Sequence, residues 1–160
     1  MFTITVISVG RLKDRFYEDA AAEYLKRLSA YAKVNIIEIK AADLPDAPGQ
    51  ALINSALQKE GREIIKKIPA DAVAVSLCVE GKLYSSEELA GLIENSAGSG
   101  ISHIAFIIGG SYGLSEEVKS KTKIRLSMSK MTFPHRLARI MLLEQIYRAF
   151  KISKGEKYHK

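Results

Sequence analysis

The sequence predicts an α/β protein with a mostly parallel sheet of five to six strands flanked by helices. Short apolar runs alternate with helix-patterned segments along the whole chain, and this alternation is typical of helices packed on a mostly parallel sheet. Residues 72–79 and 101–108 are almost continuously apolar, as expected of strands covered on both faces. No repeat or linker-like stretch divides the 160 residues. We therefore expect one domain spanning residues 1–160.

The first half of the chain is expected to contain two strands and two helices. Apolar residues recur at helical spacing from Phe16 to Tyr31, and acidic residues lie near the start, where the helix dipole favours them. Two prolines indicate a loop over Ala41–Gly49. The expected order is a strand at Phe2–Val9, a helix at Asp14–Tyr31, a strand at Val34–Ile39 and a helix at Gln50–Ile68.

The second half should add three strands and three helices. Ser85 and Ser115 are N-cap residue types followed by glutamates, so each should begin a short helix. Gly81-Lys82 is expected to form a turn. The predicted strands are Ala72–Val79, Ile101–Ile108 and Ile124–Met128, and the last helix runs from Pro134 to Lys151.

The last predicted helix is unusually apolar around its whole circumference. Pro134 suits a first helical turn, and apolar residues then occur at all angles around the axis. A surface helix carries one apolar stripe, so this helix should be buried by its own core and by a second subunit. We therefore expect a homodimer. A polar line of Glu144, Arg148 and Lys151 follows the helix at ion-pair spacing.

The charge is distributed unevenly along the chain. Residues 1–118 hold 12 Lys and Arg against 16 Asp and Glu, whereas residues 119–160 hold 12 against 2. A basic C-terminal quarter on a mildly acidic body favours a polyanionic partner, and nucleic acid is preferred over a solubilising tail.

Several functional classes are disfavoured by the sequence. One cysteine makes no internal disulfide, and three scattered histidines suggest no metal site. There is no basic signal-peptide start and no apolar run of membrane-spanning length, so we expect a cytoplasmic protein without a membrane partner. Neither a dinucleotide-binding glycine motif after the first strand nor a P-loop is present.

A ligand site is expected at the carboxyl ends of the later strands. Ligands of open α/β sheets bind there, and three such ends combine glycines or polar loops with apolar strands: Leu77–Gly81, Ile108–Gly113 and Ser127–Pro134.

The same segments resemble the ribosomal RNA large subunit methyltransferase H family, the smallest SPOUT methyltransferases. The resemblance rests on VISVGRLK, FIIGGSYGL, LSMSKMTFPHRLARIMLLEQIYRAFKI and the terminal GEKYHK, and it covers essentially the full chain. It implies an α/β fold with a C-terminal trefoil knot, although general topology rules exclude knots. It also implies a homodimer that uses S-adenosylmethionine to methylate N3 of a pseudouridine in 23S rRNA of the assembled ribosome.

The resemblance also assigns roles to residues. The cofactor pocket would use Leu77, Gly109, Met128, Ser129, Lys130, Met131, Thr132, Phe133 and Pro134. The charge distribution, in turn, leads us to expect that the basic C-terminal quarter meets RNA phosphates through Lys130, Arg136, Arg139 and Lys160.

Proton handling is left open among several residues. The acceptor nitrogen carries an imide proton, so a base or nearby cations would help. The candidates are Glu144, Arg148, His135, Tyr158 and His159. A helix ion pair at a subunit interface is an equally good interpretation of Glu144–Arg148, and packing at the helix start is a strong one for His135. Two other functions remain open: a non-catalytic RNA- or ribosome-binding module, and an enzyme for a small anionic substrate.

Overall fold

The computed structural model describes residues 1–160, and its centre is a five-stranded, fully parallel sheet. The strands follow the order β2-β1-β4-β3-β5, and every neighbouring pair is parallel. Their bounds are β1 Phe2–Val9, β2 Ala32–Ile39, β3 Val73–Leu83, β4 His103–Ile108 and β5 Ile124–Ser127. The predicted α/β architecture is confirmed, with five strands.

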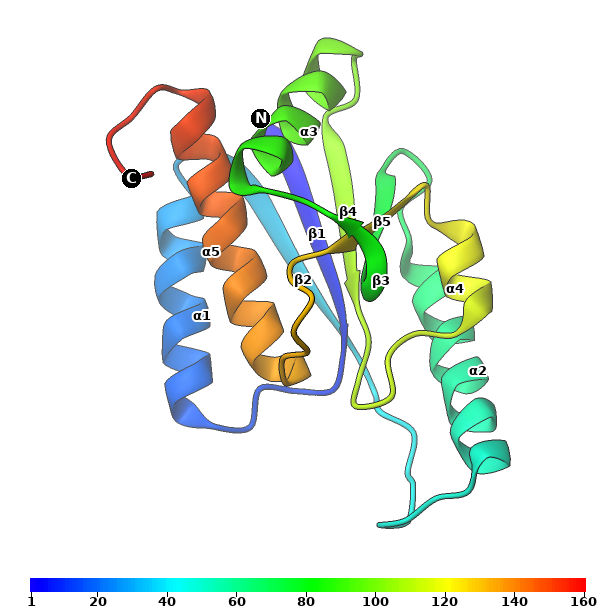
Figure 1. Ribbon diagram of the computed structural model, residues 1–160. Coiled ribbons are helices and arrows are strands. Elements are labelled where there is room, and N and C mark those ends of the chain that lie inside the picture. The colour runs from blue at the N-terminus through cyan, green and yellow to red at the C-terminus, as the bar shows by residue number, and fades with distance from the viewer.

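Five helices cover the two faces of this sheet (Figure 1). One face carries α1, α3 and α5, with α1 and α3 each packed against α5, and the other face carries α2 and α4. The helices are α1 Arg15–Leu28, α2 Gln50–Lys67, α3 Ser86–Gly98, α4 Glu116–Lys121 and α5 His135–Ser153. The alternation of strands and helices predicted from the sequence is therefore present in the predicted order.

The core lies on both faces of β1 and β4. Side chains such as Ile4 and Phe106 are fully buried towards α1, α3 and α5. Their neighbours Ile7 and Ile107 are fully buried towards α2 and α4. Successive side chains of a strand point to opposite faces, which explains why these strands are apolar at nearly every position.

The helix α5 lies between α1 and α3 and rests on the sheet (Figure 1). Its buried side chains include Leu142, Leu143 and Ile146. Much of the all-round apolar character is thus satisfied within one chain. Ile140 and Met141 remain half-buried.

The prediction of a turn at Gly81-Lys82 was wrong. Both residues lie inside β3, which pairs with β5 through Leu77, shifts register, and pairs again from Lys82. A Cβ on Gly81 would stand 2.8 Å from the backbone of Arg125, so the glycine permits close approach of two strands rather than a reversal. Other element ends differ from expectation by a few residues.

Candidate functional site

The carboxyl ends of β3, β4 and β5 surround a cavity of about 700 Å³, here called the strand-end cavity. This volume lies within the range of about 300–1,000 Å³ that is usual for small-molecule sites. Half of its 22 lining residues are hydrophobic. Eight of the nine residues predicted to bind a cofactor line it, namely Leu77, Gly109, Met128, Ser129, Met131, Thr132, Phe133 and Pro134, whereas Lys130 is exposed outside it.

The wall formed after β4 is a tight glycine turn. Gly110 and Gly113 form an isolated antiparallel bridge, and Gly113 has a φ of +82°. A Cβ on Gly109 would lie 2.3 Å from the carbonyl oxygen of Gly113, which no side chain can tolerate. The turn itself therefore requires a glycine at position 109. Any effect of this glycine on a ligand is indirect, through the shape of the turn.

The wall formed after β5 is a loop held by its own serines. The hydroxyl of Ser127 donates to the carbonyl of Ser129 over 2.9 Å, and the amide of Met131 donates to Oγ of Ser129 over 3.0 Å. These bonds turn the chain at the cavity and leave Met131 three-quarters exposed at its edge.

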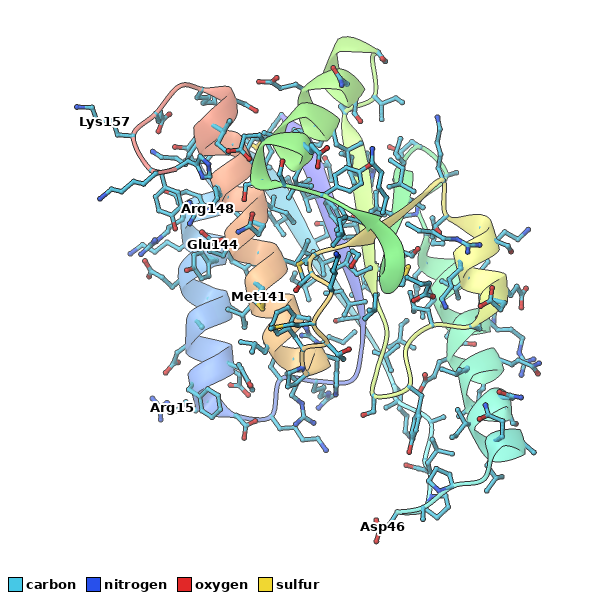
Figure 2. All side chains as sticks on the ribbon, in the orientation of Figure 1. Arg15, Asp46, Met141, Glu144, Arg148 and Lys157 are labelled. Atoms are coloured by element: carbon cyan, nitrogen blue, oxygen red, sulfur yellow. The ribbon has the colours of Figure 1, made fainter.

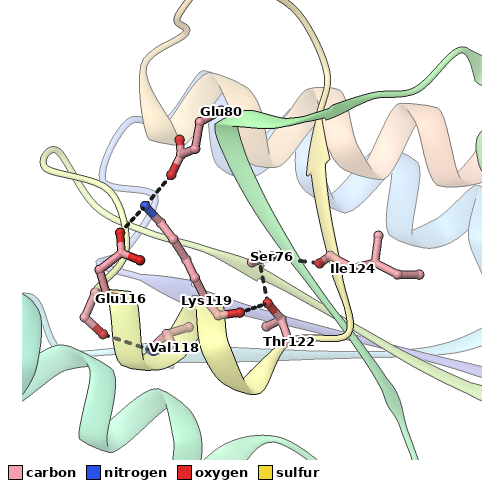
Figure 3. A network of polar contacts seen from close by, with 8 residues as sticks. Ser76, Glu80, Glu116, Val118, Lys119, Thr122 and Ile124 are labelled. Carbon is pink, nitrogen blue, oxygen red and sulfur yellow. Dashed lines mark hydrogen bonds and ion pairs between the residues drawn. The ribbon is translucent and has the colours of Figure 1, made fainter.

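A charged pair, Glu80 and Lys119, also lines the strand-end cavity. Figure 3 shows the ammonium of Lys119 between Glu80 and Glu116. At the other end of this residue, the hydroxyl of Thr122 donates to the carbonyl of Lys119 over 2.8 Å and lies 3.0 Å from the hydroxyl of Ser76. The hydrogen bond from Lys119 lowers the pKa of Glu80. Glu80 therefore stays ionised at neutral pH, and its exposed side carries a negative charge at the cavity edge.

His135, the first residue of α5, lines the cavity as well. Burial lowers the pKa of its imidazole, and the charges of Arg136 and Arg139 lower it further. The imidazole is thus neutral at physiological pH, the form in which one ring nitrogen can accept a proton.

The other predicted catalytic residues lie away from this cavity, along α5 and in the C-terminal tail. Figure 2 shows Met141, Glu144 and Arg148 following one another along α5. Glu144 accepts from Nε and Nη2 of Arg148 over 3.0 and 2.6 Å, from Gln145 over 2.8 Å and from the hydroxyl of Tyr158 over 3.2 Å. Glu144 thus links two neighbours on its own helix to a tyrosine of the C-terminal tail.

The tail folds back onto α5 instead of fraying. The ring of Tyr158 packs edge-on against Tyr147 with centroids 4.9 Å apart, and the guanidinium of Arg148 lies 4.8 Å from its centre. Burial, and then the charge of Glu144, raise the pKa of Tyr158, so its phenol stays protonated at neutral pH.

The network defines the tautomer of His159. Nη1 of Arg148 lies 3.2 Å from Nδ1 of His159, and an arginine has no acceptor, so Nδ1 accepts. The ring proton then sits on Nε2, which donates to Glu87 over 2.7 Å. Glu144, Arg148, Tyr158 and His159 therefore form one connected group.

A second cavity of about 520 Å³, here called the α5 groove, borders both of these regions. Leu126 and Met128 line both cavities, and Glu144 lines the α5 groove. Tyr24, Tyr84, Ile140 and Met141 supply much of its remaining wall. The strand-end cavity and Glu144 are thus neighbours across the β5 strand end.

The residues expected to bind RNA differ in accessibility. Lys130 and Lys160 are exposed and Arg136 is half-buried. Arg139 is 4% exposed, with Nη1 2.8 Å from Glu38 and Nη2 2.9 Å from the carbonyl oxygen of Gly10. Its guanidinium is committed to these partners, contrary to a role in direct phosphate contact.

The strand ends expected to bind a ligand contain Cys78, Glu80 and Tyr112, which line the cavity, although none of the three was assigned a role. Sequence reasoning missed Lys119, which also lines it. Lys119 comes from α4 and meets Glu80 only through tertiary packing, so no local pattern identified it.

Two further observations bear on the type of site. No group of three or more His, Cys, Asp or Glu side chains is arranged to hold a metal ion. None of the helices combines the length and apolarity that crossing a membrane requires.

Comparison of the sequence with known protein families finds close relatives over the whole chain. A family model described as "Predicted SPOUT methyltransferase" matches residues 2–159. A protein of Pelotomaculum thermopropionicum called ribosomal RNA large subunit methyltransferase H is 49% identical over 159 residues, covering 99% of both chains. A protein of the same name from Clostridium botulinum strain Langeland is 52% identical over 157 residues, covering 98% of this chain and 99% of the relative.

Among solved structures, a probable methylase family protein from Haemophilus influenzae has a related fold. Its TM-score is 0.55 at 15% identity, and the alignment covers 99% of this chain and 70% of the other. At this identity the likeness concerns the fold alone.

Proposed function

The chain belongs to the SPOUT methyltransferase family, and we propose that it methylates N3 of a pseudouridine in 23S rRNA of the assembled ribosome. The protein is thus an enzyme, a methyltransferase, rather than a binding module alone. The substrate is supported by full-length relatives that carry the name ribosomal RNA large subunit methyltransferase H. The observation that carries the proposal is the strand-end cavity with its wall from Met128 to Pro134.

The cofactor of this proposal is S-adenosylmethionine, and the cavity suits it chemically. A partly apolar wall can hold an adenine ring and a thioether chain, while Glu80 and Lys119 offer charges to a zwitterionic amino acid group. The bound cofactor would supply an activated sulfonium methyl group. The protein then needs mainly to position the acceptor nitrogen and exclude water.

Removal of the imide proton is the step that needs protein side chains. Arg148 can stabilise the deprotonated imide through its positive charge, and its hydrogen bond to Glu144 fixes the position of the guanidinium. His159 can accept a proton on Nδ1 once that nitrogen leaves Arg148. Tyr158 keeps its own proton, and its ring, which already lies under the guanidinium of Arg148 and packs edge-on against Tyr147, can pack against a base. His135 remains a second candidate base because it is neutral and lines the cavity.

The proposal includes a homodimer. The connected group of Glu144, Arg148, Tyr158 and His159, here called the tail group, does not line the strand-end cavity. The half-buried side chains of Ile140 and Met141 line the mainly apolar α5 groove. A second chain seated on this groove would cover it and bring additional side chains to the cavity. The trefoil knot and the cytoplasmic location stay predictions that follow from the family.

The proposal is tested by methyl transfer to ribosomes that lack this modification. Purified protein with S-adenosylmethionine should add one methyl group to 23S rRNA, and mass mapping should place it on a pseudouridine. A double substitution at Met128 and Phe133 to aspartate should abolish cofactor binding by adding charge to an apolar wall. Absence of rRNA methylation by the wild-type protein, with intact cofactor binding, would refute the substrate.

A further inference from the structure

The loop between β1 and α1, residues 10–14, presents two cations that no acid neutralises. Arg11 and Lys13 are exposed, and neither has a carboxylate within 4.0 Å. Asp14 is the only acid in the loop, and its side chain caps nothing in α1. Unpaired exposed cations keep their full attraction for an anionic partner.

Two arginines near the start of α5 donate hydrogen bonds to the backbone of this loop. Nη2 of Arg139 donates to the carbonyl of Gly10 over 2.9 Å, and Nε of Arg136 donates to the carbonyl of Arg11 over 3.2 Å. The amide of Gly10 donates to the carbonyl of Ile39 over 2.8 Å. Two successive backbone acceptors are therefore satisfied by arginines, which leaves the loop with an excess of positive charge and a fixed backbone.

The loop also adjoins the strand-end cavity. A Cβ on Gly10 would stand 3.9 Å from Cε1 of His135, whose side chain lines the cavity. In Figure 1 this loop lies at the same edge of the sheet as the glycine turn after β4. An extended anion that reaches into the cavity past the start of α5 would pass over Arg11 and Lys13.

We propose that Arg11 and Lys13 bind the phosphate backbone of the substrate RNA next to the nucleotide that enters the strand-end cavity. This inference rests on the proposed rRNA substrate. Phosphates receive most protein–nucleic acid hydrogen bonds, and arginine matches their geometry with two donors. The buried Arg139 acts differently, since it supports the loop without contacting RNA.

The test compares two double variants with equal loss of charge. Arg11→Ala with Lys13→Ala removes the proposed contacts. Lys33→Ala with Lys67→Ala is the matched control, because both lysines are exposed, free of ion pairs, and placed at the start of β2 and the end of α2, the opposite edge of the sheet. Binding to unmodified ribosomes is measured at several salt concentrations, and S-adenosylmethionine affinity is measured by calorimetry.

The loop variant should bind ribosomes more weakly, and its logarithmic salt slope should fall by roughly 0.7 to 0.9 for each phosphate that the protein no longer neutralises. The control should keep the wild-type slope, and both should bind S-adenosylmethionine as the wild type does. Equal slopes in the two double variants would overturn the inference, although wild-type methylation would leave the proposed function standing.

A variant that removes a negative charge instead of positive ones keeps the proposal testable if the loop double variant misfolds. Asp14→Asn removes the one opposing charge and no hydrogen bond of α1, so it should tighten ribosome binding at low salt. If the loop double variant fails to fold, unchanged affinity in Asp14→Asn refutes the proposal. A wild-type protein that does not methylate rRNA would instead remove the proposed function, and this inference with it.

Discussion

Gly109 shows how a single missing carbon atom determines the shape of the strand-end cavity. A Cβ there would meet the carbonyl of Gly113 at 2.3 Å, so Gly109→Ala must open the turn that closes the cavity. We expect at least about a tenfold loss of S-adenosylmethionine affinity, equal to about 1.4 kcal/mol. Calorimetry measures it.

A matched substitution for Gly109→Ala exists on α3. A Cβ on Gly91 would have no atom within 4 Å, so Gly91→Ala should leave cofactor affinity unchanged and stabilise the helix by up to about 1 kcal/mol. Unchanged affinity in Gly109→Ala would show that the turn does not shape the cofactor site.

The imidazole of His135 should make the protein sensitive to acid. Burial lowers its pKa in the folded state, so the unfolded chain takes up a proton first as the pH falls. The stabilising contribution is complete above the unfolded pKa of about 6.5 and is lost as the pH falls below it.

Denaturant titrations at pH 7.5 and pH 5.5 check this expectation. The free energy of unfolding should fall less between the two values in His135→Asn than in the wild type. Parallel behaviour of the two proteins would mean that His135 is not held neutral in the folded state.

Among the elements, the C-terminal tail is joined to α5 through aromatic and charged contacts. Deleting residues 157–160 should leave S-adenosylmethionine affinity near the wild-type value, because no tail residue lines the strand-end cavity. Methylation of rRNA should fall by at least about a hundredfold, the lower end for loss of acid–base catalysis. Single-turnover kinetics measures the effect.

Lys157→Ala provides the control for this deletion, since Lys157 is exposed and its side chain makes no hydrogen bond or ion pair. It should methylate at nearly the wild-type rate. If the truncated protein also does so, proton handling is left to Glu144, Arg148 and His135.

For the molecule as a whole, the α5 groove is the surface that a single chain leaves incompletely covered. Half-buried Ile140 and Met141, with Tyr24 and Tyr84, line it. We expect a stable dimer in sedimentation at micromolar concentration. Met141→Lys should shift the protein towards monomer, because it places a charge in an apolar interface.

A separate exposed position distinguishes an interface effect from a general one. Leu52 on α2 is half exposed and lies on the other face of the sheet, so Leu52→Lys should remain dimeric. A wild-type protein that sediments as a monomer would contradict the dimer and would leave the tail group without a route to the cavity.

Local sequence patterns were sufficient to predict the α/β class, the order of all ten elements and the strand ends that form the cavity. Periodicity and continuous apolar runs are local properties, so they can be recognised without the fold. The strand ends followed because parallel strands place their carboxyl ends at one edge. The cofactor-binding roles of residues such as Leu77 and Gly109 came from the family resemblance, and both residues fell at the edge that the strand-end argument had selected.

Tertiary packing was needed to tell which charged side chains are free and which are committed. Arg136 and Arg139 stand three residues apart in one basic segment. Arg136 stays half-buried and bonds a backbone carbonyl, whereas Arg139 is buried against Glu38, 101 positions away. Lys119 likewise meets Glu80 across two elements. Such pairings depend on the packing of distant segments, which local patterns do not contain. The same reason explains Gly81, whose role is set by the neighbouring strand β5.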